Sequence, residues 1–284
     1  MSLTKIRFVT DSAADIPVDL VKKWDIGVVP AYINYNGKSY ADDGVELVRE
    51  DYFKNLHGYH PHPTTSAMPP AVAEAILTQW FEGADHLVVI TTPAKLSAIH
   101  NSIRLGAQKL PQDRVHLIDS GQLCLAMGWQ VLVGAEVAAR TGDLQATLDA
   151  IQKVRQHSTL YAGLATIEYL RRSGRVGWAQ AGLGALLQIK PVLQVQDSKV
   201  ASIARVRTFS RVIDTLVELA YKHAPLDKLA ILHVNSLESV AELRARLKDI
   251  MPEDTITTGI GPTLGTHTGP GAIGIAPVSA AWKA

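Results

Sequence analysis

One histidine near the end of the chain lies in a glycine-rich stretch that would hold it close to a ligand. The stretch reads ITTGIGPTLGTHTGPGAIGIAPV, from Ile256 to Val278, and His267 lies among its glycines. Glycine adopts positive φ angles and allows close approach of the backbone. Three roles are open for His267 at this point: a ligand contact, a metal ligand, or a residue that completes a turn.

Hydroxyl and carboxylate side chains gather where three predicted strands end. The carboxyl ends of parallel strands share one edge of a sheet, and ligands bind beyond that edge. Serine, threonine and aspartate also cap helix N-termini, so each residue alone has a structural alternative. Their coincidence on one edge favours a binding site. The residues are Asp11, Ser12, Thr92, Ser97 and Ser120.

A proline-rich loop, HPHPTTSAMPP over 60–70, places further hydroxyls ahead of a predicted helix. Unpaired N–H groups at a helix start favour an anion, which makes Thr65 a candidate contact; a helix cap is the alternative. Three histidines lie in or near this loop, at 57, 60 and 62. Their spacing matches no common zinc pattern, so we expect no metal here.

Two groups of arginines are candidates for binding a carboxylate or a phosphate, because the planar guanidinium group forms paired hydrogen bonds with either group. A solvated basic face is the alternative. No G-x-G-x-x-G follows the first strand, and neither a P-loop nor a G-x-S-x-G elbow occurs. The sequence therefore predicts no nucleotide site of its own. The arginines are Arg171, Arg172 and Arg175, then Arg205, Arg207 and Arg211.

The nearly balanced charge, with 28 Lys and Arg against 27 Asp and Glu, does not favour nucleic acid or an anionic membrane as a partner.

The single cysteine, Cys124, lies in an apolar run and is expected to be a buried structural thiol, which fits a reducing cytosol. No signal peptide begins the chain, and no apolar run reaches the roughly 18 residues of a membrane span. We expect a cytoplasmic protein.

The first half alternates apolar strands with helices, which predicts a mostly parallel sheet covered on both faces. Asn36-Gly37 predicts a hairpin turn. Strands are expected over 6–10, 86–92 and 114–120, and helices over 47–56, 69–81, 96–110 and, as a pair, 122–156.

The second half mixes strand directions and predicts an α+β layer. A glycine-punctuated helical stretch runs over 167–191, and a hairpin is expected over 191–208 about Asp197-Ser198. A strand is expected at 159–166, followed by a helix, a strand and a helix at 209–222, 228–234 and 237–250. The fold class is therefore α/β with two domains, 1–157 and 158–284, and a ligand between them.

Five segments together resemble the DegV family of bacterial fatty-acid-binding proteins, in the right order over essentially the whole chain. The resemblance implies that one long-chain fatty acid lies in a tunnel between the domains. Some members, called FakB, present the acyl carboxylate to a separate ATP-dependent fatty acid kinase, which makes an acyl phosphate for phospholipid synthesis. The segments are VTDSAADIP, TSAMPP, GRVGWAQAGLGALLQIKPVLQVQDSKV, ARVRT and IGPTLGTHTGPGAIGIA.

The resemblance also implies roles for particular residues. By match, Thr65, Ser97 and His267 meet the carboxylate. Arg207, with Arg205 beside it, is tied to phosphoryl transfer or the partner, and His267 would help to stabilise the new phosphate. No cofactor or metal belongs to this chain in that scheme, because the kinase supplies the phosphoryl donor.

The chain departs from the family pattern at two places, where the usual TSQPS reads TSAMP and the usual ISSGLSGTY reads ITTPAKLSAIH with two extra residues.

A different function also stays open. A serine hydrolase or acyltransferase would use Ser97 with His267, oriented by Asp11 or Asp119. A transcriptional regulator is disfavoured, because no basic patch or helix-turn-helix is evident.

Overall fold

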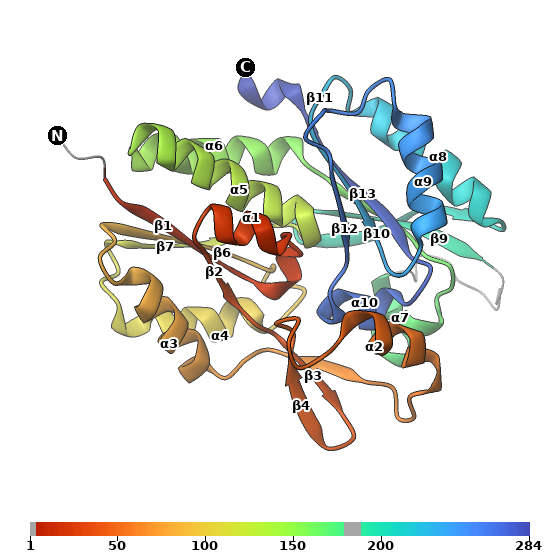
Figure 1. Ribbon diagram of the computed structural model, residues 1–284, viewed down its shortest axis with the longest axis horizontal. Helices are drawn as coiled ribbons and strands as arrows, with labels where there is room; N and C mark the ends of the chain where they lie inside the picture. The colour runs from red at the N-terminus through yellow and green to blue at the C-terminus, as the bar shows by residue number, and fades with distance from the viewer. Residues whose placement is uncertain (1–3, 179–188) are drawn as a thin grey trace.

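Two large sheets with helices packed between and around them build the molecule (Figure 1). The computed structural model describes residues 4–178 and 189–284. In the first half, four strands pair in parallel in the order β2-β1-β6-β7, as the continuous apolar runs predict. These strands are β1 (Ile6–Asp11), β2 (Ile26–Val29), β6 (His86–Thr91) and β7 (Val115–Asp119).

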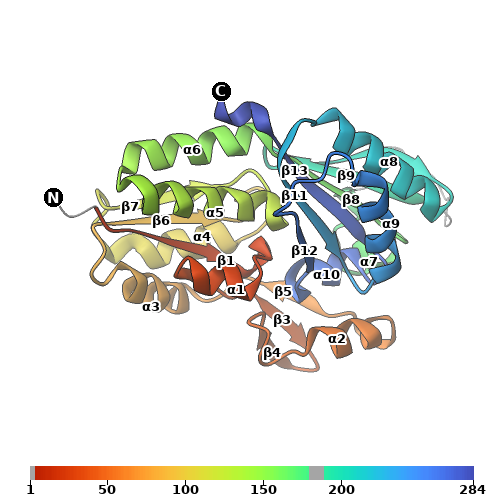
Figure 2. The ribbon, with the colours of Figure 1, turned by 45° about the horizontal axis from the view of Figure 1, so that its top comes forward.

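Helices cover both faces of this parallel sheet, because alternate side chains of each strand point to opposite sides. Phe8 and Val88 join the core cluster that contains α5, and Val9 and Val89 join the cluster that contains α3 and α4. Figure 2 shows α5 and α6 above the sheet, with α3 and α4 below it. The predicted fold class is confirmed. The helices are α3 (Pro70–Phe81), α4 (Ile99–Gly106), α5 (Cys124–Thr141) and α6 (Leu144–His157).

The second sheet has six strands in the order β10-β9-β8-β13-β11-β12, and all its pairs are antiparallel except β11 with β12. The predicted hairpin between β9 and β10 turns at Asp197 and Ser198, both with positive φ. Helices α8 (Phe209–Lys222) and α9 (Leu237–Leu247) cover one face. The strands are β8 (Leu160–Gly163), β9 (Lys190–Gln196), β10 (Lys199–Val206), β11 (Leu226–His233), β12 (Ile256–Gly259) and β13 (Ile273–Ser279).

Helix α5 lies between the two sheets and is therefore apolar on nearly all sides. Its residues share one core cluster with Phe8 of the first sheet and with Leu193 and Leu232 of the second. Trp129 donates its indole N–H to the carbonyl of Ala276 at 3.0 Å, so the helix also hydrogen-bonds to the second sheet. Across the described ranges, 4–178 and 189–284, no helix meets the length and apolarity that crossing a membrane requires.

A small antiparallel sheet, β4-β3-β5, extends from the first half (Figure 1). Its hairpin turns at Asn36-Gly37, as predicted, and both residues have positive φ. The elements of this region are α1 (Val18–Lys23), β3 (Tyr32–Tyr35), β4 (Lys38–Ala41), α2 (Arg49–Asn55) and β5 (Thr64–Ser66).

Two expectations differ from the structure. The stretch around His267 is a short helix, α10 (Pro262–Thr268), and not a turn, because packing against α2 and the small sheet overrides the low helix propensity of glycine. In the helical stretch over 167–191, only α7 (Glu168–Arg172) and a 3₁₀ turn (Val176–Trp178) form helix, and 179–188 lie outside the described residues. The domain boundary at 157 falls between α6 and β8 and stays a prediction.

Candidate functional site

A cavity of about 310 Å³ lies beyond the carboxyl ends of β1 and β6. The chain leaves β1 toward β2 on one side and later enters β6 on the other, so the strand order changes direction between β1 and β6. Open parallel sheets bind ligands at such a switch point. Both halves of the chain contribute to the walls, which include Ala13, Thr65, Thr92, Ser97, Arg175, Thr263, Leu264 and His267.

Thr65 and His267 meet on one wall of this cavity. Thr65 lies on β5, where it pairs with Ile33, and His267 lies near the end of α10. The Oγ1 atom of Thr65 is 3.0 Å from Nε2 of His267. The two polar groups predicted to share a ligand head group are therefore hydrogen-bonded to each other.

His267 is an electrically neutral imidazole at neutral pH. It is only 5% exposed, and burial lowers its pKa from 6.5 to about 3, with smaller contributions from the positive charge of Arg175 and from His62. A neutral imidazole has one nitrogen that donates and one that accepts. Its Nε2 can therefore either accept the hydroxyl proton of Thr65 or donate to it, depending on the tautomer.

Two buried carboxyl groups from the first half hold the start of α10. The Oδ1 atom of Asp15 accepts from the backbone N–H of Gly261 at 2.6 Å, and Oδ2 of Asp42 accepts from the N–H of Thr263 at 3.0 Å. The first N–H groups of a helix have no partner within the helix, so such acceptors fix where it begins. Asp15 and Asp42 thereby position the helix that carries His267.

The glycines around His267 permit close packing of α10 against its neighbours. A Cβ atom on Gly265 would lie 2.2 Å from the ring of Phe53 in α2. Gly269 has a φ of +74°, and a Cβ atom there would lie 2.0 Å from the ring of Tyr169. Both contacts exclude any larger residue without movement of an aromatic ring, which explains why glycines surround the histidine.

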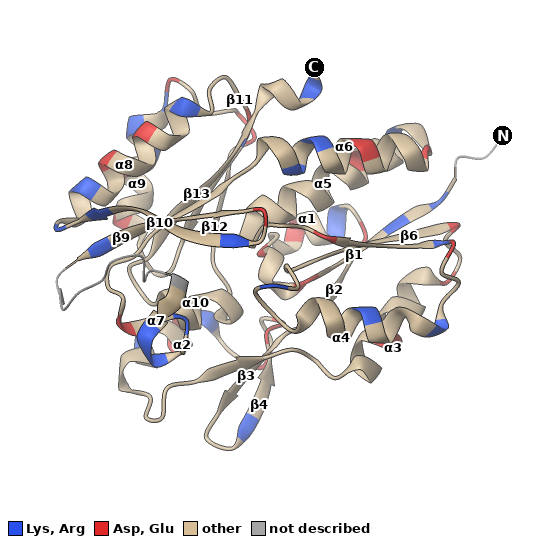
Figure 3. Cartoon of the chain, turned by 180° about the vertical axis from the view of Figure 1, so that it is seen from behind, with Lys and Arg blue, Asp and Glu red and all other residues tan. Residues whose placement is uncertain are grey.

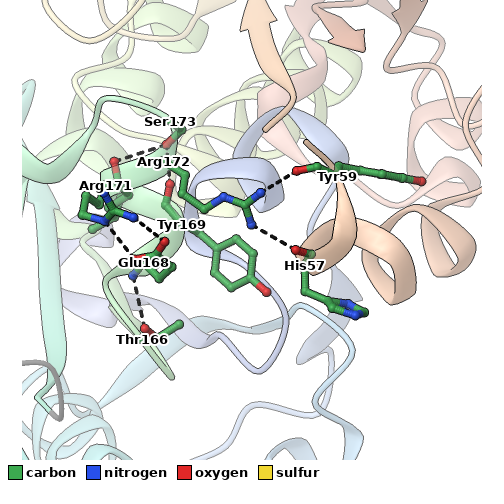
Figure 4. A network of polar contacts seen from close by, with 9 residues as sticks. His57, Tyr59, Thr166, Glu168, Tyr169, Arg171, Arg172 and Ser173 are labelled. Carbon is green, nitrogen blue, oxygen red and sulfur yellow. Dashed lines mark hydrogen bonds and ion pairs between the residues drawn. The ribbon is translucent and has the colours of Figure 1, made fainter. Parts of the chain in front are cut away.

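A second connection ties the loop before Thr65 to α7 (Figure 4). Arg172 donates to the carbonyl of His57 at 3.2 Å and also to the carbonyl of Tyr59. Its neighbour Arg171 pairs with Glu168 at 2.7 Å, within the same helix. The second half of the chain therefore holds the loop that leads into β5, just as the first half holds α10.

Ser97 and Thr92 also line the cavity. The Ser97 hydroxyl accepts from the N–H of Ile99 at 3.3 Å, at the start of α4. Thr92 donates both its N–H and its hydroxyl to the carboxyl group of Asp11, at 2.6 and 2.8 Å. Asp11 is fully buried, which raises its pKa from 3.8 to about 6. The carboxyl group of Asp11 holds Thr92 in place through these two hydrogen bonds.

The remaining residues predicted at the sheet edge lie away from the ligand-facing wall. The Ser12 hydroxyl accepts from the N–H of Ala31 at 3.1 Å and lies 3.4 Å from the Thr263 hydroxyl. Ser120 is completely buried and donates to the carbonyl of Gln122 at 2.9 Å. The Ser12 hydroxyl therefore links three separate segments of the chain, and the Ser120 hydroxyl holds a local turn; neither residue caps a helix.

The predicted arginines divide between the cavity and the surface. Arg175 is half-buried and lines the cavity, whereas Arg205 on β10 and Arg207 just beyond it are exposed. Basic residues on β10 and on α7 are visible from the same side of the molecule (Figure 3). Arg175 belongs to the first arginine group noted in the sequence, but spacing alone does not single it out. Its place in the cavity depends on the turn after α7.

A second, smaller cavity adjoins the first, in the space between the sheets. Its volume is about 40 Å³, and Leu123 and Leu264 line both cavities. Beyond them the lining is almost entirely apolar, with Leu160, Leu193, Val195, Val200, Leu232 and Ile260 among its residues. A polar chamber at His267 and an apolar chamber at the interface of the two sheets therefore lie next to each other, with Leu123 and Leu264 between them.

Comparison with known proteins gives the family. The model of the DegV family, described as uncharacterised proteins, matches residues 5–280. The chain belongs to the DegV family. A DegV domain-containing protein of Streptomyces coelicolor is 30% identical over 275 residues, which cover 95% of this chain and 97% of the relative. The predicted resemblance is confirmed.

Solved structures of DegV proteins share the fold over nearly the whole chain. A Thermus thermophilus DegV protein, described by its fatty acid binding, superposes with a TM-score of 0.89 at 30% identity, covering 97% of this chain and 100% of that one. DegV of Bacillus subtilis, described as a fatty acid binding protein, gives 0.83 at 25% identity, with 97% and 100% covered. Both confirm the α/β fold class.

Across the part of the chain that the structure describes, no group of three or more His, Cys, Asp and Glu is arranged to hold a metal ion. His62, one of the three loop histidines, instead contacts the carbonyl of Thr266 through Nε2 at 3.0 Å. Cys124 is buried, and its thiol donates to Oδ2 of Asp15 at 2.9 Å.

Proposed function

We propose that the protein binds one long-chain fatty acid, with its carboxylate at Thr65 and His267 and its tail along the apolar residues between the sheets, where the chamber of about 40 Å³ would widen to admit it. The observation that carries this proposal is that the two cavities are adjacent and share Leu123 and Leu264 in their walls. Leu264 and His267 lie three residues apart on α10, so one helix face serves both the apolar and the polar chamber. The fatty acid binding described for the Thermus and Bacillus relatives supports it.

Burial of the tail would supply most of the affinity. Each methylene removed from water contributes about 0.8 kcal/mol, so about fourteen methylenes of a sixteen-carbon acid give about 11 kcal/mol before the costs of association. The polar groups then need only fix the position of the carboxylate. Thr65 donates a hydroxyl proton to it, Ser97 offers a second hydroxyl, and the positive charge of Arg175 offsets the negative charge.

We further propose that the bound carboxylate is presented to a separate kinase. One carboxylate oxygen would attack the terminal phosphorus of ATP, forming the new O–P bond as the P–O bond to ADP breaks, and ADP would leave with that electron pair. The neutral His267 would donate its single N–H to the new phosphate in place of its hydrogen bond to Thr65. The exposed Arg205 and Arg207 would contact the phosphoryl group or the kinase.

Uptake of oleate by the delipidated protein tests the binding proposal. Leu264→Trp would fill the junction of the chambers and should reduce oleate uptake at least tenfold. Leu237→Trp is the matched control, because Leu237 is 70% exposed on α9, and it should bind like wild type. Equal uptake by Leu264→Trp and wild type would contradict the proposed path of the tail.

Hydrolysis of a p-nitrophenyl ester tests the alternative enzymatic function. Ser97 and His267 line the same cavity, and a carrier should show no turnover that depends on either residue. Turnover by the wild type that Ser97→Ala abolishes would instead favour a serine hydrolase or acyltransferase.

A further inference from the structure

Trp129 of α5 packs against the middle of the second sheet. Its indole N–H donates to the carbonyl of Ala276 on β13 at 3.0 Å, and the residue is only 3% exposed. The paired residues of β8 and β13 end at Tyr161 and Ile275, so Ala276 is the next residue of β13 after this ladder. The hydrogen bond therefore fixes the indole ring at one level of the sheet.

A row of four neighbouring residues crosses the sheet at the level of Ala276. The register of β8 with β13 places Leu160 beside Ala276. Ala230 on β11 pairs with Ala276, and it also pairs with Ile256 of β12. All four residues pack in the core cluster that contains Trp129. The two alanines in the middle of the row are small, so they leave room for the indole ring.

The two ends of this row line different cavities. Leu160 lines the apolar chamber of the proposed fatty-acid site. Ile256 and Trp129 line a third cavity, of about 190 Å³, between α1, α5 and the start of β12. Neighbouring strands are about 4.8 Å apart, so Leu160 and Ile256 are about 14 Å apart. The indole of Trp129 therefore lies between the apolar chamber and the third cavity.

The sheet side of the apolar chamber has a trough that points toward this indole. Ala162 on β8 and Gly274 on β13 are paired small residues in its lining. Leu193 lies beside Ala162, and Leu232 lies beside Gly274, so a leucine borders the small pair on each side. Ala276 follows Gly274 by two residues on the same face of β13, which is about 7 Å. A tail in the trough would therefore run along β13 and meet the indole end-on.

The third cavity would accept more of an apolar chain if the indole were absent. Leu20, Leu132 and Ile256 give it aliphatic walls. Lys228 and Asp254, an ion pair whose side chains are 21% and 57% exposed, also line it, so this cavity lies near the protein surface. The indole thus keeps the apolar chamber apart from a polar edge that water reaches.

We infer, on the basis of the proposed fatty-acid function, that Trp129 closes the far end of the tail path and sets the longest fatty acid that the protein binds well. The indole is large, and its displacement would leave the carbonyl of Ala276 without this hydrogen bond. The favoured ligand is then an acid whose terminal methyl group reaches Trp129 and does not pass it. Trp129 is a specificity-determining residue in this scheme.

Quenching of tryptophan fluorescence by bound 16-bromohexadecanoate tests the contact in the wild type, because bromine quenches an indole only at short range. Relative to hexadecanoate, the brominated acid should quench part of the fluorescence of the five tryptophans. Trp129→Phe should lose at least half of this quenching. Trp24→Phe, which removes a tryptophan from the α1 side of the third cavity, should retain it. Quenching that Trp129→Phe leaves unchanged, or no quenching by the bound acid, would overturn the inference.

A chain-length series tests the limit itself. In wild type, each added methylene should tighten binding about fourfold until the tail reaches Trp129, and longer acids should gain nothing more. Trp129→Leu should lower the ratio of the eicosanoate Kd to the hexadecanoate Kd at least tenfold, which corresponds to about two further buried methylenes. Trp24→Leu is the matched control and should keep the wild-type ratio.

The same series separates this inference from the proposed function. Binding of the acids by wild type, with the same ratio of Kd values in Trp129→Leu, would overturn the role of Trp129 and leave fatty-acid binding intact. Failure of wild type to bind any acid of the series would overturn both. The quenching experiment with Trp129→Phe, which keeps an aromatic ring in place, decides the matter if Trp129→Leu does not fold.

Discussion

Thr65 Oγ1 lies 3.0 Å from His267 Nε2, although the two residues are 202 positions apart in the chain. Different hydrogen-bonding residues, called anchors here, hold Thr65 and His267 in place. Asp15 and Asp42 fix the start of the helix that carries His267, and Arg172 fixes the loop that leads to Thr65. Each anchor crosses between the two halves of the chain, so the pair exists only when the halves are packed together.

Removing the Thr65 hydroxyl should weaken retention of the fatty acid. Thr65→Val keeps the β-branched shape on β5 and removes one hydrogen bond to the carboxylate, at a cost of about 1–1.5 kcal/mol or about tenfold in Kd. Competition titration with a fluorescent fatty acid measures the change. Thr64→Val, at the exposed neighbouring position of β5 outside the cavity lining, is the control, and equal Kd values for Thr65→Val and wild type would count against the contact.

His267→Ala should separate binding from phosphorylation. Because the tail dominates the affinity, the variant should retain fatty acid within about tenfold of wild type. Loss of a group that stabilises the transferring phosphate should lower acyl-phosphate formation by a partner kinase about 100-fold or more. Formation of acyl phosphate at the wild-type rate would refute this role for the imidazole.

Asp42→Ala should loosen α10. The N–H of Thr263 would lose its buried acceptor, which costs about 1–3 kcal/mol in the free energy of unfolding. Hydrogen exchange of a peptide spanning 260–270 should accelerate more than that of the rest of the protein. Asp43→Ala removes the exposed neighbour and should leave this peptide protected; equal exchange in both variants would show that Asp42 does not hold the helix.

The stability contributed by Asp15 should decrease as the pH rises. Burial raises the pKa of Asp15 from 3.8 to about 7, so the folded protein keeps a proton that the unfolded chain releases. Its contribution is complete below about pH 4 and is lost as the pH rises through about 7, a change of up to about 4 kcal/mol. Asp15→Asn removes this titration and tolerates the left-handed backbone at this position, where φ is 51°.

Urea denaturation of wild type and Asp15→Asn at pH 5 and pH 8 measures that change. The free energy of unfolding of wild type, relative to the variant, should be lower at pH 8 than at pH 5. Subtraction of the variant cancels the opposite effect of the buried His267, whose lowered pKa reduces stability in acid. A difference that is independent of pH would contradict the raised pKa of Asp15.

Local sequence patterns predict most of the fold. The apolar strands of the first sheet, the helices on its faces and the turns at Asn36-Gly37 and Asp197-Ser198 follow from periodicity and turn chemistry. Helix α10 does not, because Gly265 weakens any helical signal; contacts from distant segments, such as that of Phe53 with Gly265 and that of Asp42 with Thr263, stabilise it. Propensity is overridden there by tertiary packing.

The sequence predicts the residues that face the cavity, but it does not predict the residues that hold them in place. Thr65 and His267 belong to recognisable motifs, and the structure brings them together. Asp42 contacts Thr263, 221 positions away, from a loop whose local sequence resembles an ordinary polar surface. No local signal distinguishes a buried aspartate in such a loop from an exposed one, so these supports appear only in the folded structure.

Native mass spectrometry of the freshly purified protein, with chromatographic identification of whatever it releases, shows whether the protein carries a fatty acid. One bound long-chain fatty acid per chain is the predicted result, either as purified or after addition of oleate. A chain that is empty as purified, and that takes up neither oleate nor palmitate, would contradict the account.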